Sequence, residues 1–281
     1  MDVVILAGGA GRRFGGVKQL EPIGPNGEAL FEYTLRDARR AGCDRAVLVV
    51  APGCEAEFEA VMAARPIEGL EVRLAVQRLD DMPGPVPSGR TRPWGTAHAL
   101  WAARHEVRGP FLLFNADDSY GPTAPATLAA ALTGGGCDFA MLGYRLDATL
   151  SPEGTVSRAL CDVDDHGLLR GLVEYPAVDG EGVVASEPES GRVLPLDALV
   201  SMNAWAFTPA VFPLLERMLS AFLALADLTR DESYLPAAVA AAVRRGEAAV
   251  RVTPAGDRWC GLTWPGDREI VRRRIADMED S

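Results

Sequence analysis

A glycine-rich loop with two neighbouring arginines follows the first apolar segment of the chain. The apolar segment covers residues 2–7, and the loop covers residues 8–16 with Arg12 and Arg13 in its middle. Glycine lets the backbone approach an anion closely, and cationic side chains offset the charge of that anion. Open α/β sheets bind ligands where the first strand ends. The loop therefore predicts a site for the phosphates of a nucleotide.

Two well-known phosphate-binding loops do not fit this segment. A dinucleotide-binding loop runs directly into a helix, and an acidic residue follows the second strand. Here the next helical pattern starts only at residue 28, and the second strand ends in Val-Val-Ala-Pro at residues 49–52. A Walker A loop needs Gly-Lys-Ser/Thr, whereas Val17 precedes Lys18. The pattern therefore disfavours both a nicotinamide-dependent oxidoreductase and a P-loop enzyme.

Lysine, asparagine and glutamine are rare in this chain. Of its 28 basic residues, only Lys18 is a lysine. An ammonium is a compact charge with three donors, whereas a guanidinium is a broad planar fork, so arginine cannot replace lysine everywhere. The few residues of these types are therefore candidates for functional positions. They are Lys18, Asn26, Asn115, Asn203, Gln19 and Gln77.

Alternating strand and helix patterns predict how these residues are positioned. Apolar strand patterns cover residues 2–7, 46–51, 70–77, 110–114 and 138–144, and helical patterns cover residues 28–41, 55–65, 95–105 and 123–133. Such alternation builds parallel βαβ units. Further along, residues 154–163 and 168–175 suggest a hairpin, 198–207, 248–253 and 258–264 are extended, and 209–226, 234–245 and 267–277 are helical. The long Pro- and Gly-rich stretch 78–94 is typical of a binding loop.

The glycine-rich loop resembles the signature loop of the sugar-phosphate nucleotidyltransferases. The resemblance lies in Leu6-Ala7-Gly8-Gly9-Ala10-Gly11-Arg12-Arg13-Phe14, followed by Lys18-Gln19-Leu20. It implies that Arg13 holds the triphosphate and that Lys18 reaches the α-phosphate. Arg12 stands where the family usually has serine or threonine. The nucleotide-binding residues implied here are Leu6, Ala7, Gly8, Gly9, Gly11 and Arg12.

Two further segments resemble the part of this family that binds the nucleobase. Residues 95–99, Gly-Thr-Ala-His-Ala, open a predicted helix, and the resemblance implies that Gly95, Thr96 and His98 contact the nucleotide. A buried, hydrogen-bonded histidine in a first helical turn is the alternative for His98. Gln77 ends the third predicted strand, where relatives often have a base-reading glutamine.

The segment Asn115-Ala116-Asp117-Asp118 ends a predicted strand and resembles the metal site of the family. The resemblance implies that Asp117 binds Mg²⁺, a hard cation that prefers carboxylate oxygen. Asp118 either assists as a second metal ligand or caps the following helix, and capping is the alternative for Asp117 as well. Asn115 is expected on the acceptor side of the site.

Two matches in the second half concern the acceptor. Glu174 lies in a segment resembling the family's Glu-Lys-Pro, with Tyr175 at the lysine position, and Asn203 matches a substrate-binding asparagine. Gly261 stands where several relatives have a second metal-binding aspartate. Asp257 or Asp267 would replace that carboxylate, or the site uses one metal ion.

Composition excludes several other classes of protein. The chain has 281 residues, 48% hydrophobic residues and a net charge of −11, so it is an ordinary globular chain. The acidic balance argues against nucleic-acid and anionic-membrane partners. No apolar run approaches the roughly 20 residues that span a bilayer. The odd number of cysteines, without a C-x-x-C pair, favours reduced thiols and a cytoplasmic location.

Together these patterns predict a Rossmann-like three-layer α/β/α fold with a mixed, mainly parallel central sheet. Residues 1–145 are expected to form a nucleotide-binding half and residues 146–281 an acceptor-binding half that completes the same sheet. The resemblance implies a reaction that joins the NMP part of an NTP to a sugar 1-phosphate, with Mg²⁺, and releases pyrophosphate. Transfer to a choline, polyol or molybdopterin-type phosphate, or nucleotide sensing without turnover, are the alternatives. The nucleobase, the acceptor and a homo-oligomeric state stay open.

Overall fold

The computed structural model describes residues 1–9, 17–184, 191–264 and 266–279. Gly11, Arg12 and Arg13 lie outside these ranges, so their predicted roles stay predictions. No helix in the described ranges is both long enough and apolar enough to cross a membrane.

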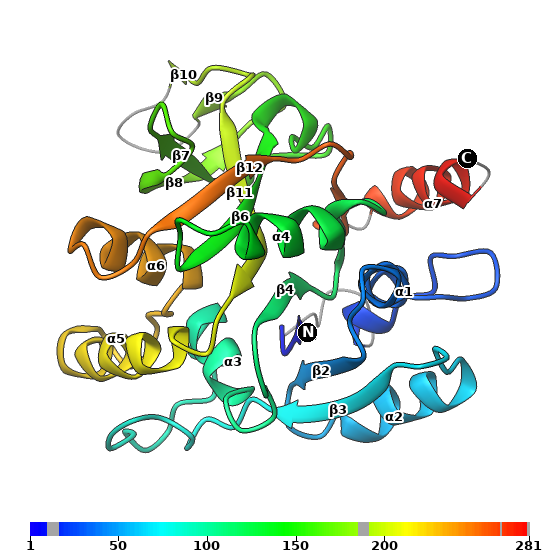
Figure 1. Cartoon of the computed structure of the whole chain (residues 1–281), viewed down its shortest axis with the longest axis horizontal. Coiled ribbons are helices and arrows are strands. Elements are labelled where there is room, and N and C mark those ends of the chain that lie inside the picture. The colour runs from blue at the N-terminus through cyan, green and yellow to red at the C-terminus, as the bar shows by residue number, and fades with distance from the viewer. Residues whose placement is uncertain (10–16, 185–190, 265, 280–281) are drawn as a thin grey trace.

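The predicted α/β class is confirmed (Figure 1). The helices are α1 (Leu30–Arg40), α2 (Glu55–Ala64), α3 (Thr96–Ala102), α4 (Ala124–Thr133), α5 (Val211–Leu225), α6 (Leu235–Arg244) and α7 (Asp267–Glu279), with short 3₁₀ turns η2 (Lys18–Leu20) and η3 (Leu146–Ala148). The strands are β1 (Asp2–Ala7), β2 (Arg45–Val50), β3 (Glu71–Val76), β4 (Phe111–Asn115), β5 (Asp118–Ser119), β6 (Phe139–Arg145), β7 (Val156–Val163), β8 (Leu169–Val178), β9 (Val183–Val184), β10 (Arg192–Val193), β11 (Leu199–Phe207), β12 (Val250–Pro254) and β13 (Cys260–Gly261).

Most of the strands form one mixed sheet. Its main order is β10-β9-β8-β7-β11-β4-β1-β2-β3, and β6 pairs with both β11 and β12. β1 to β4 run parallel, as the βαβ pattern predicts, whereas β11 runs antiparallel to β4. The remaining pair, β5 and β13, forms a small separate ladder.

The sheet branches at β11. Trp205–Phe207 of β11 pair with β4, while Val200 and Ser201 pair with β7. Because β6 occupies the other edge of β11, β4 and β7 share the same edge and one follows the other along it. The β11–β6 register shifts between Ser201 and Trp205, at the junction of these two neighbours. This junction places the carboxyl end of β4 beside β7 and β8.

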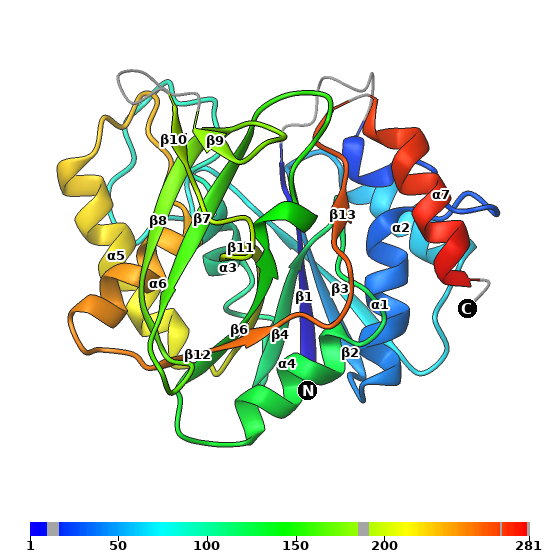
Figure 2. The same ribbon diagram turned by 90° about the horizontal axis from the view of Figure 1, so that it is seen from above.

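Helices cover both faces of the sheet, because alternate strand residues point to opposite sides. In β1, Val3 and Ile5 pack in the core under α1, α2 and α4, whereas Val4 and Leu6 pack under α3, α5 and α6. Figure 2 shows α5 and α6 on one side and α1 and α2 on the other. α7 packs on the outside through a third cluster that includes Leu30 of α1 and Ile275.

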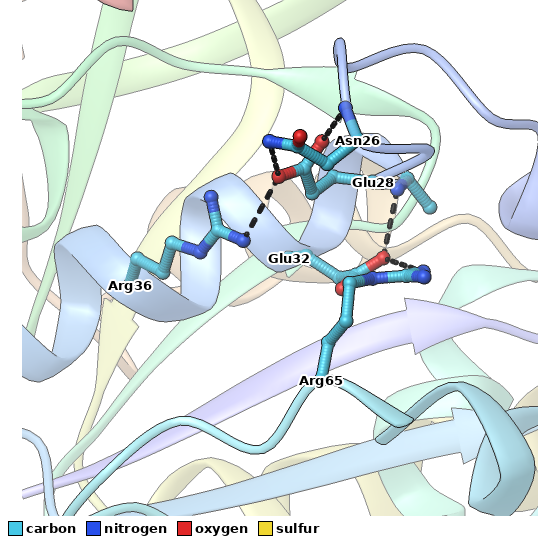
Figure 3. A network of polar contacts seen from close by, with 6 residues as sticks. Asn26, Glu28, Glu32, Arg36 and Arg65 are labelled. Atoms are coloured by element: carbon cyan, nitrogen blue, oxygen red, sulfur yellow. Dashed lines mark hydrogen bonds and ion pairs between the residues drawn. The ribbon is translucent and has the colours of Figure 1, made fainter. Parts of the chain in front are cut away.

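A polar network fixes the start of α1, just beyond η2 (Figure 3). Glu32 accepts a hydrogen bond from the backbone N–H of Ala29 at 2.8 Å and bonds Arg65 through both carboxylate oxygens at 2.7 Å. Glu28 accepts hydrogen bonds from Asn26 and Arg36. These bonds explain why the helix starts at Leu30 and not at residue 28. They fix the end of the helix that follows η2, the turn that carries Lys18.

Candidate active site

Two adjoining cavities open at the carboxyl ends of β1 and β4. The loop cavity, of about 740 Å³, is lined by the end of β1, by Gln77 and by residues 91–93, 95 and 96. The strand cavity, of about 590 Å³, is lined by residues of β7, β8 and β11 and by residues on either side of β13. Thr96, Asn115, Asp117 and Asn203 line both cavities and form their shared wall. The two cavities therefore have room for two ligands that meet at this wall.

An ion pair lies at the shared wall. Lys18 Nζ, on η2, is 2.8 Å from Oδ2 of Asp117, which follows β4. Both side chains are partly buried, so solvent screens this pair less than an exposed one. The structure thus brings together the lysine and the aspartate that the sequence analysis singled out.

Asp118 lies behind Asp117 in a buried polar cluster. Its Oδ2 accepts hydrogen bonds from Asn115 Nδ2 at 2.8 Å and from the Tyr120 hydroxyl at 3.1 Å. Burial, and then the charge of Asp117, raise the pKa of Asp118 to about 7. The next helix, α4, has Thr123 at its N-cap position, so neither Asp117 nor Asp118 caps it. The helix-cap alternative is therefore wrong for both carboxylates.

Asn203 connects this cluster to β11. Its Nδ2 lies 3.4 Å from Asn115 Oδ1, and its Oδ1 accepts a hydrogen bond from Trp205 Nε1 at 3.2 Å. Asn203 has a φ of 60° at the β11 irregularity, a left-handed conformation that costs energy for a residue with a Cβ. Such conformations cluster at functional sites. This backbone conformation thus directs the Asn203 amide to the wall between the cavities.

Gly261 makes room for Asp118. The two residues are partners in the β5–β13 ladder, and a Cβ on Gly261 would lie 2.2 Å from Asp118 Oδ1. Neither expected replacement carboxylate lines the two cavities. Asp257 accepts hydrogen bonds from the backbone N–H and hydroxyl of Thr123. Asp267, the first residue of α7, accepts them from the backbone N–H groups of Thr263 and Trp264. Both carboxylates thus have hydrogen-bond partners of their own, and a role for either of them in a metal site stays a prediction.

Asp117 and Asp118 fit a divalent cation. They are adjacent carboxylates that line the strand cavity. Asp118 is only 8% exposed and its pKa is raised, and a nearby cation would favour its ionised form. No cluster of three or more His, Cys, Asp or Glu residues that could hold a metal exists in the described ranges. Magnesium sites of this kind use one or two carboxylates and take further oxygen ligands from substrate phosphates and water.

The loop cavity contains most of the predicted nucleotide-binding residues. Leu6, Gly8, Gly9, Gln77, Gly95 and Thr96 line it, and so does Gln19. Ala7 does not, because its side chain points to the opposite face of the sheet and packs with the core under α1. The prediction that Ala7 contacts the nucleotide is therefore corrected.

Gly95 is required for a close contact within the protein. Its φ is 97°, and a Cβ there would lie 2.5 Å from the backbone oxygen of Ser233. Ser233 and the Thr96 hydroxyl hold the start of α6, since Leu235 N–H donates to Thr96 Oγ1 at 2.9 Å. The segment at residues 95–99 is thus fixed by α6 while it lines the cavity.

His98 lies behind the cavity and does not line it. It is fully buried, with Nδ1 3.2 Å from Gln77 Nε2 and Nε2 2.9 Å from the backbone oxygen of Asp81. Burial lowers the pKa of His98, which favours the neutral ring. The prediction of a direct nucleotide contact is therefore corrected to the alternative, a buried and hydrogen-bonded histidine.

The strand cavity contains Glu174, Asn203 and Asn115 as expected, and one residue that the motifs missed. Glu174 accepts a hydrogen bond from Ser157 across the β7–β8 ladder. Tyr175, at the position of the family's lysine, is buried in the core and lines neither cavity. Its cross-strand partner is Arg158, which does line the strand cavity.

Arg158 is a buried cation held in place by neutral groups. Its guanidinium bonds Thr149 Oγ1 at 3.0 Å, the Thr149 carbonyl, and the Ser157 carbonyl at 2.7 Å, and its Cζ lies 5.3 Å from the Trp259 ring centroid. No carboxylate forms an ion pair with it among the described residues. Burial lowers its pKa to about 10, so it stays charged at neutral pH. The motifs could not identify Arg158 as a site residue, because its place in the strand cavity depends on how β7 pairs with β8.

The rare residue types gather at this site. Lys18, Gln19, Gln77, Asn115 and Asn203 line the two cavities, whereas Asn26 belongs to the network at the start of α1. Five of the six residues that composition singled out therefore line the two cavities.

The chain belongs to the family of MobA-like NTP transferase domains, whose profile matches residues 3–224. This family match identifies the chain as a nucleotidyltransferase. No curated protein sequence matches the chain significantly.

Solved structures share the fold across nearly the whole chain. The inositol-1-phosphate CTP transferase from T. maritima aligns with a TM-score of 0.69 and 19% identity, over 100% of this chain and 96% of the other. HddC from Yersinia pseudotuberculosis aligns with a TM-score of 0.60 and 13% identity, over 98% and 99%. HddC complexed with GMP-PN aligns at 0.59 and 16%, with the same coverage. At these identities the likeness concerns the fold.

Proposed function

We propose that the protein transfers the NMP part of an NTP to the phosphate of a small molecule, a sugar 1-phosphate in the first place, and releases pyrophosphate. The observation that carries this proposal is the shared wall. An NTP in the loop cavity and an acceptor in the strand cavity would meet beside Lys18, Asp117, Asn115 and Asn203.

In this reaction the protein mainly positions the two substrates and neutralises the charge of the phosphates. An acceptor phosphate oxygen forms a bond to the α-phosphorus while the bond to pyrophosphate breaks. No general base is needed, because a phosphate acceptor is already ionised at neutral pH. Lys18 would neutralise charge at the α-phosphate, and Arg12, Arg13 and Gly11 would hold the remaining phosphates.

Asp117 and Asp118 are the residues that would hold Mg²⁺. The cation, when bound, supplies charge neutralisation at the phosphate oxygens. Glu174, Asn203 and Arg158 would contact the acceptor, with Arg158 providing a cation that Tyr175 does not. The free thiols and the use of an NTP support a cytoplasmic location. Homo-oligomer formation stays a prediction from the sequence.

A polyol phosphate is the second candidate acceptor. Tyr175 stands at the position of the family's lysine and its side chain is buried, so this position supplies no lysine to the strand cavity. A protein of similar fold is named for inositol 1-phosphate and CTP. Another similar structure was solved with GMP-PN. The acceptor panel should therefore include inositol 1-phosphate beside the sugar 1-phosphates.

The test is pyrophosphate release with Mg²⁺ over a grid of five NTPs and this acceptor panel. We expect release that requires one NTP together with one acceptor, and that is lost in Asp117→Asn. Confirmed NTP binding with no release in any combination would contradict transfer and favour a nucleotide-binding protein without turnover.

A further inference from the structure

Arg158, on β7, is a buried cation that leaves two of its hydrogen-bond donors unused. The residue is 7% exposed, and a guanidinium has five N–H donors. Nε and Nη2 donate to the hydroxyl and the carbonyl of Thr149, and Nη1 donates to the carbonyl of Ser157, the preceding residue. Within the described part of the chain these are its only hydrogen bonds, so each terminal nitrogen keeps one free N–H.

The two free N–H groups of Arg158 form a fork. Nε and Nη2 share the side of the guanidinium that faces Thr149, and the Nη1 hydrogen that reaches Ser157 is directed back toward the arginine's own backbone. The hydrogens that are left are therefore the pair at the far end of the group. Such a pair matches the two oxygens of an acidic group, and no carboxylate of the described residues pairs with it.

A small side cavity, of about 60 Å³, adjoins the strand cavity at this arginine. Arg158, Trp259 and Thr263 line both cavities. A single water molecule needs about 10–15 Å³, so the side cavity has room for a group of a few heavy atoms. Its size fits a carboxylate and is too small for a sugar ring.

The lining of the side cavity carries an excess of positive charge. Arg158 and Arg274 line it, and Asp267 is the one acidic residue among its described lining residues. The Asp267 carboxylate already accepts hydrogen bonds from the backbone N–H groups of Thr263 and Trp264. One positive charge is thus left without a counterion, and a buried cation without one is costly. A single carboxylate from a ligand would balance it.

We propose that Arg158 binds a carboxylate of the acceptor, a group distinct from the phosphate that reacts. The inference rests on the proposed function and specifies the acceptor as a phosphorylated compound that also carries a carboxylic acid. The reacting phosphate would lie at the shared wall, beside the NTP in the loop cavity. Arg158 lines the strand and side cavities but not the loop cavity, so it meets another part of the acceptor.

The charge of the surroundings makes a preference for an acidic acceptor informative. The chain has a net charge of −11, and Asp117, Asp118 and Glu174 line the strand cavity. Both repel additional negative charge on a ligand. A more acidic acceptor therefore binds better only where a local cation receives the added group.

Calorimetry with matched pairs of acceptors tests the inference, with Mg²⁺ and a non-hydrolysable analogue of each NTP in turn. The members of a pair differ in one carboxylate: glucose and glucuronic acid 1-phosphate, galactose and galacturonic acid 1-phosphate, glycerol 3-phosphate and 3-phosphoglycerate. We expect the carboxylate-bearing member of at least one pair to bind at least about tenfold more tightly than its partner. Equal or weaker binding of all three overturns the inference. Pyrophosphate release with an acceptor that lacks a carboxylate would then leave the proposed function standing.

Arg158→Gln separates binding of the carboxylate from binding of the reacting phosphate. We expect the advantage of the carboxylate-bearing acceptor to fall to within about twofold, while its partner keeps its affinity. An equal loss for both members of the pair would place Arg158 at the reacting phosphate and contradict the inference. The matched control is Arg170→Gln, at an exposed arginine of the neighbouring strand β8, and it should leave both affinities unchanged.

Arg158→Lys carries the test if the glutamine variant does not fold. The ammonium keeps the positive charge but does not offer a planar fork. We expect the advantage of the carboxylate-bearing acceptor to fall at least about threefold, with the affinity of its partner unchanged. The full advantage in a folded Arg158→Lys protein would contradict recognition by the fork.

Discussion

Lys18 and Asp117 are 99 positions apart in the chain, yet their charged atoms lie 2.8 Å apart at the wall between the cavities. The lysine is the only one among 28 basic residues, which suggests that a guanidinium does not serve there. A compact ammonium can move between a carboxylate and a phosphate oxygen within a small volume. The importance of this residue type is a claim about single residues, and single substitutions test it.

Lys18→Arg should keep the charge and the fold but lower kcat/KM at least about 100-fold, because the planar fork does not fit a point-charge site. Steady-state pyrophosphate release measures the effect, and thermal unfolding checks the fold. Arg217→Lys, at an exposed arginine of α5, is the matched control and should leave activity unchanged. Near-normal turnover in Lys18→Arg would remove the lysine from the catalytic machinery.

Asp117→Asn should abolish Mg²⁺-dependent turnover and weaken binding of Mn²⁺, used as a spectroscopic probe. The melting temperature should change little, because the carboxylate is partly exposed and caps no helix. Unchanged Mn²⁺ affinity together with a large loss of stability would point to a structural role instead.

The buried ring of His98 predicts a pH dependence of stability. Burial lowers its pKa in the folded protein, whereas the unfolded value stays near 6.5. Between the two values the unfolded state binds more protons, so the free energy of unfolding falls as pH drops below about 6.5. Urea unfolding at pH 7.5 and 5.5 should show a larger fall for the wild type than for His98→Asn. Equal falls would contradict a buried neutral histidine.

At the scale of elements, the sequence predicted the regular strands and helices well, because periodicity and glycine signals mark them. It missed β5, β9 and β10, since two-residue strands carry no periodic pattern, although it did predict an extended segment around β13. The contact between Asp118 and Gly261 depends on one such short ladder, and the position of Arg158 depends on the β7–β8 register. Motifs identify residues, but pairing decides which face and which cavity those residues reach.

Gly95 tests the packing of α3 against the start of α6. Gly95→Ala should cost about 2–4 kcal/mol of unfolding free energy, because the residue has a positive φ and its Cβ would strike the Ser233 backbone. Gly109→Ala is the matched control, since a Cβ there meets nothing within 4 Å, and it should stay within about 0.5 kcal/mol. Equal costs would show that the contact with Ser233 is not tight.

Asp257 tests whether α4 is capped from a distant part of the chain. Asp257→Asn should lower stability by about 1 kcal/mol through weaker bonds to Thr123, and leave pyrophosphate release intact. Loss of Mg²⁺-dependent turnover with full stability would instead support a role for Asp257 in the metal site.

At the scale of the whole molecule, the site forms where the parallel strands of the first half meet the antiparallel strands of the second. Strand β11 joins the two sets of strands, since β4 and β7 share one of its edges. Its irregular backbone at Asn203 directs that side chain to the wall between the cavities. The sequence predicted the α/β class, and most of the described residues that it singled out line the two cavities. It could not predict that a branched sheet divides the site into two cavities with a common wall, because that depends on long-range pairing.

The most direct test of this account is the identity of the reaction product. The protein would be incubated with Mg²⁺, its preferred NTP and a phosphorylated acceptor, and the mixture analysed by mass spectrometry and phosphorus NMR. We predict equal amounts of pyrophosphate and of a product in which the NMP is joined to the acceptor through a diphosphate bond. Release of free NMP without such a product, or formation of the adduct by Asp117→Asn at the wild-type rate, would contradict transfer across the shared wall.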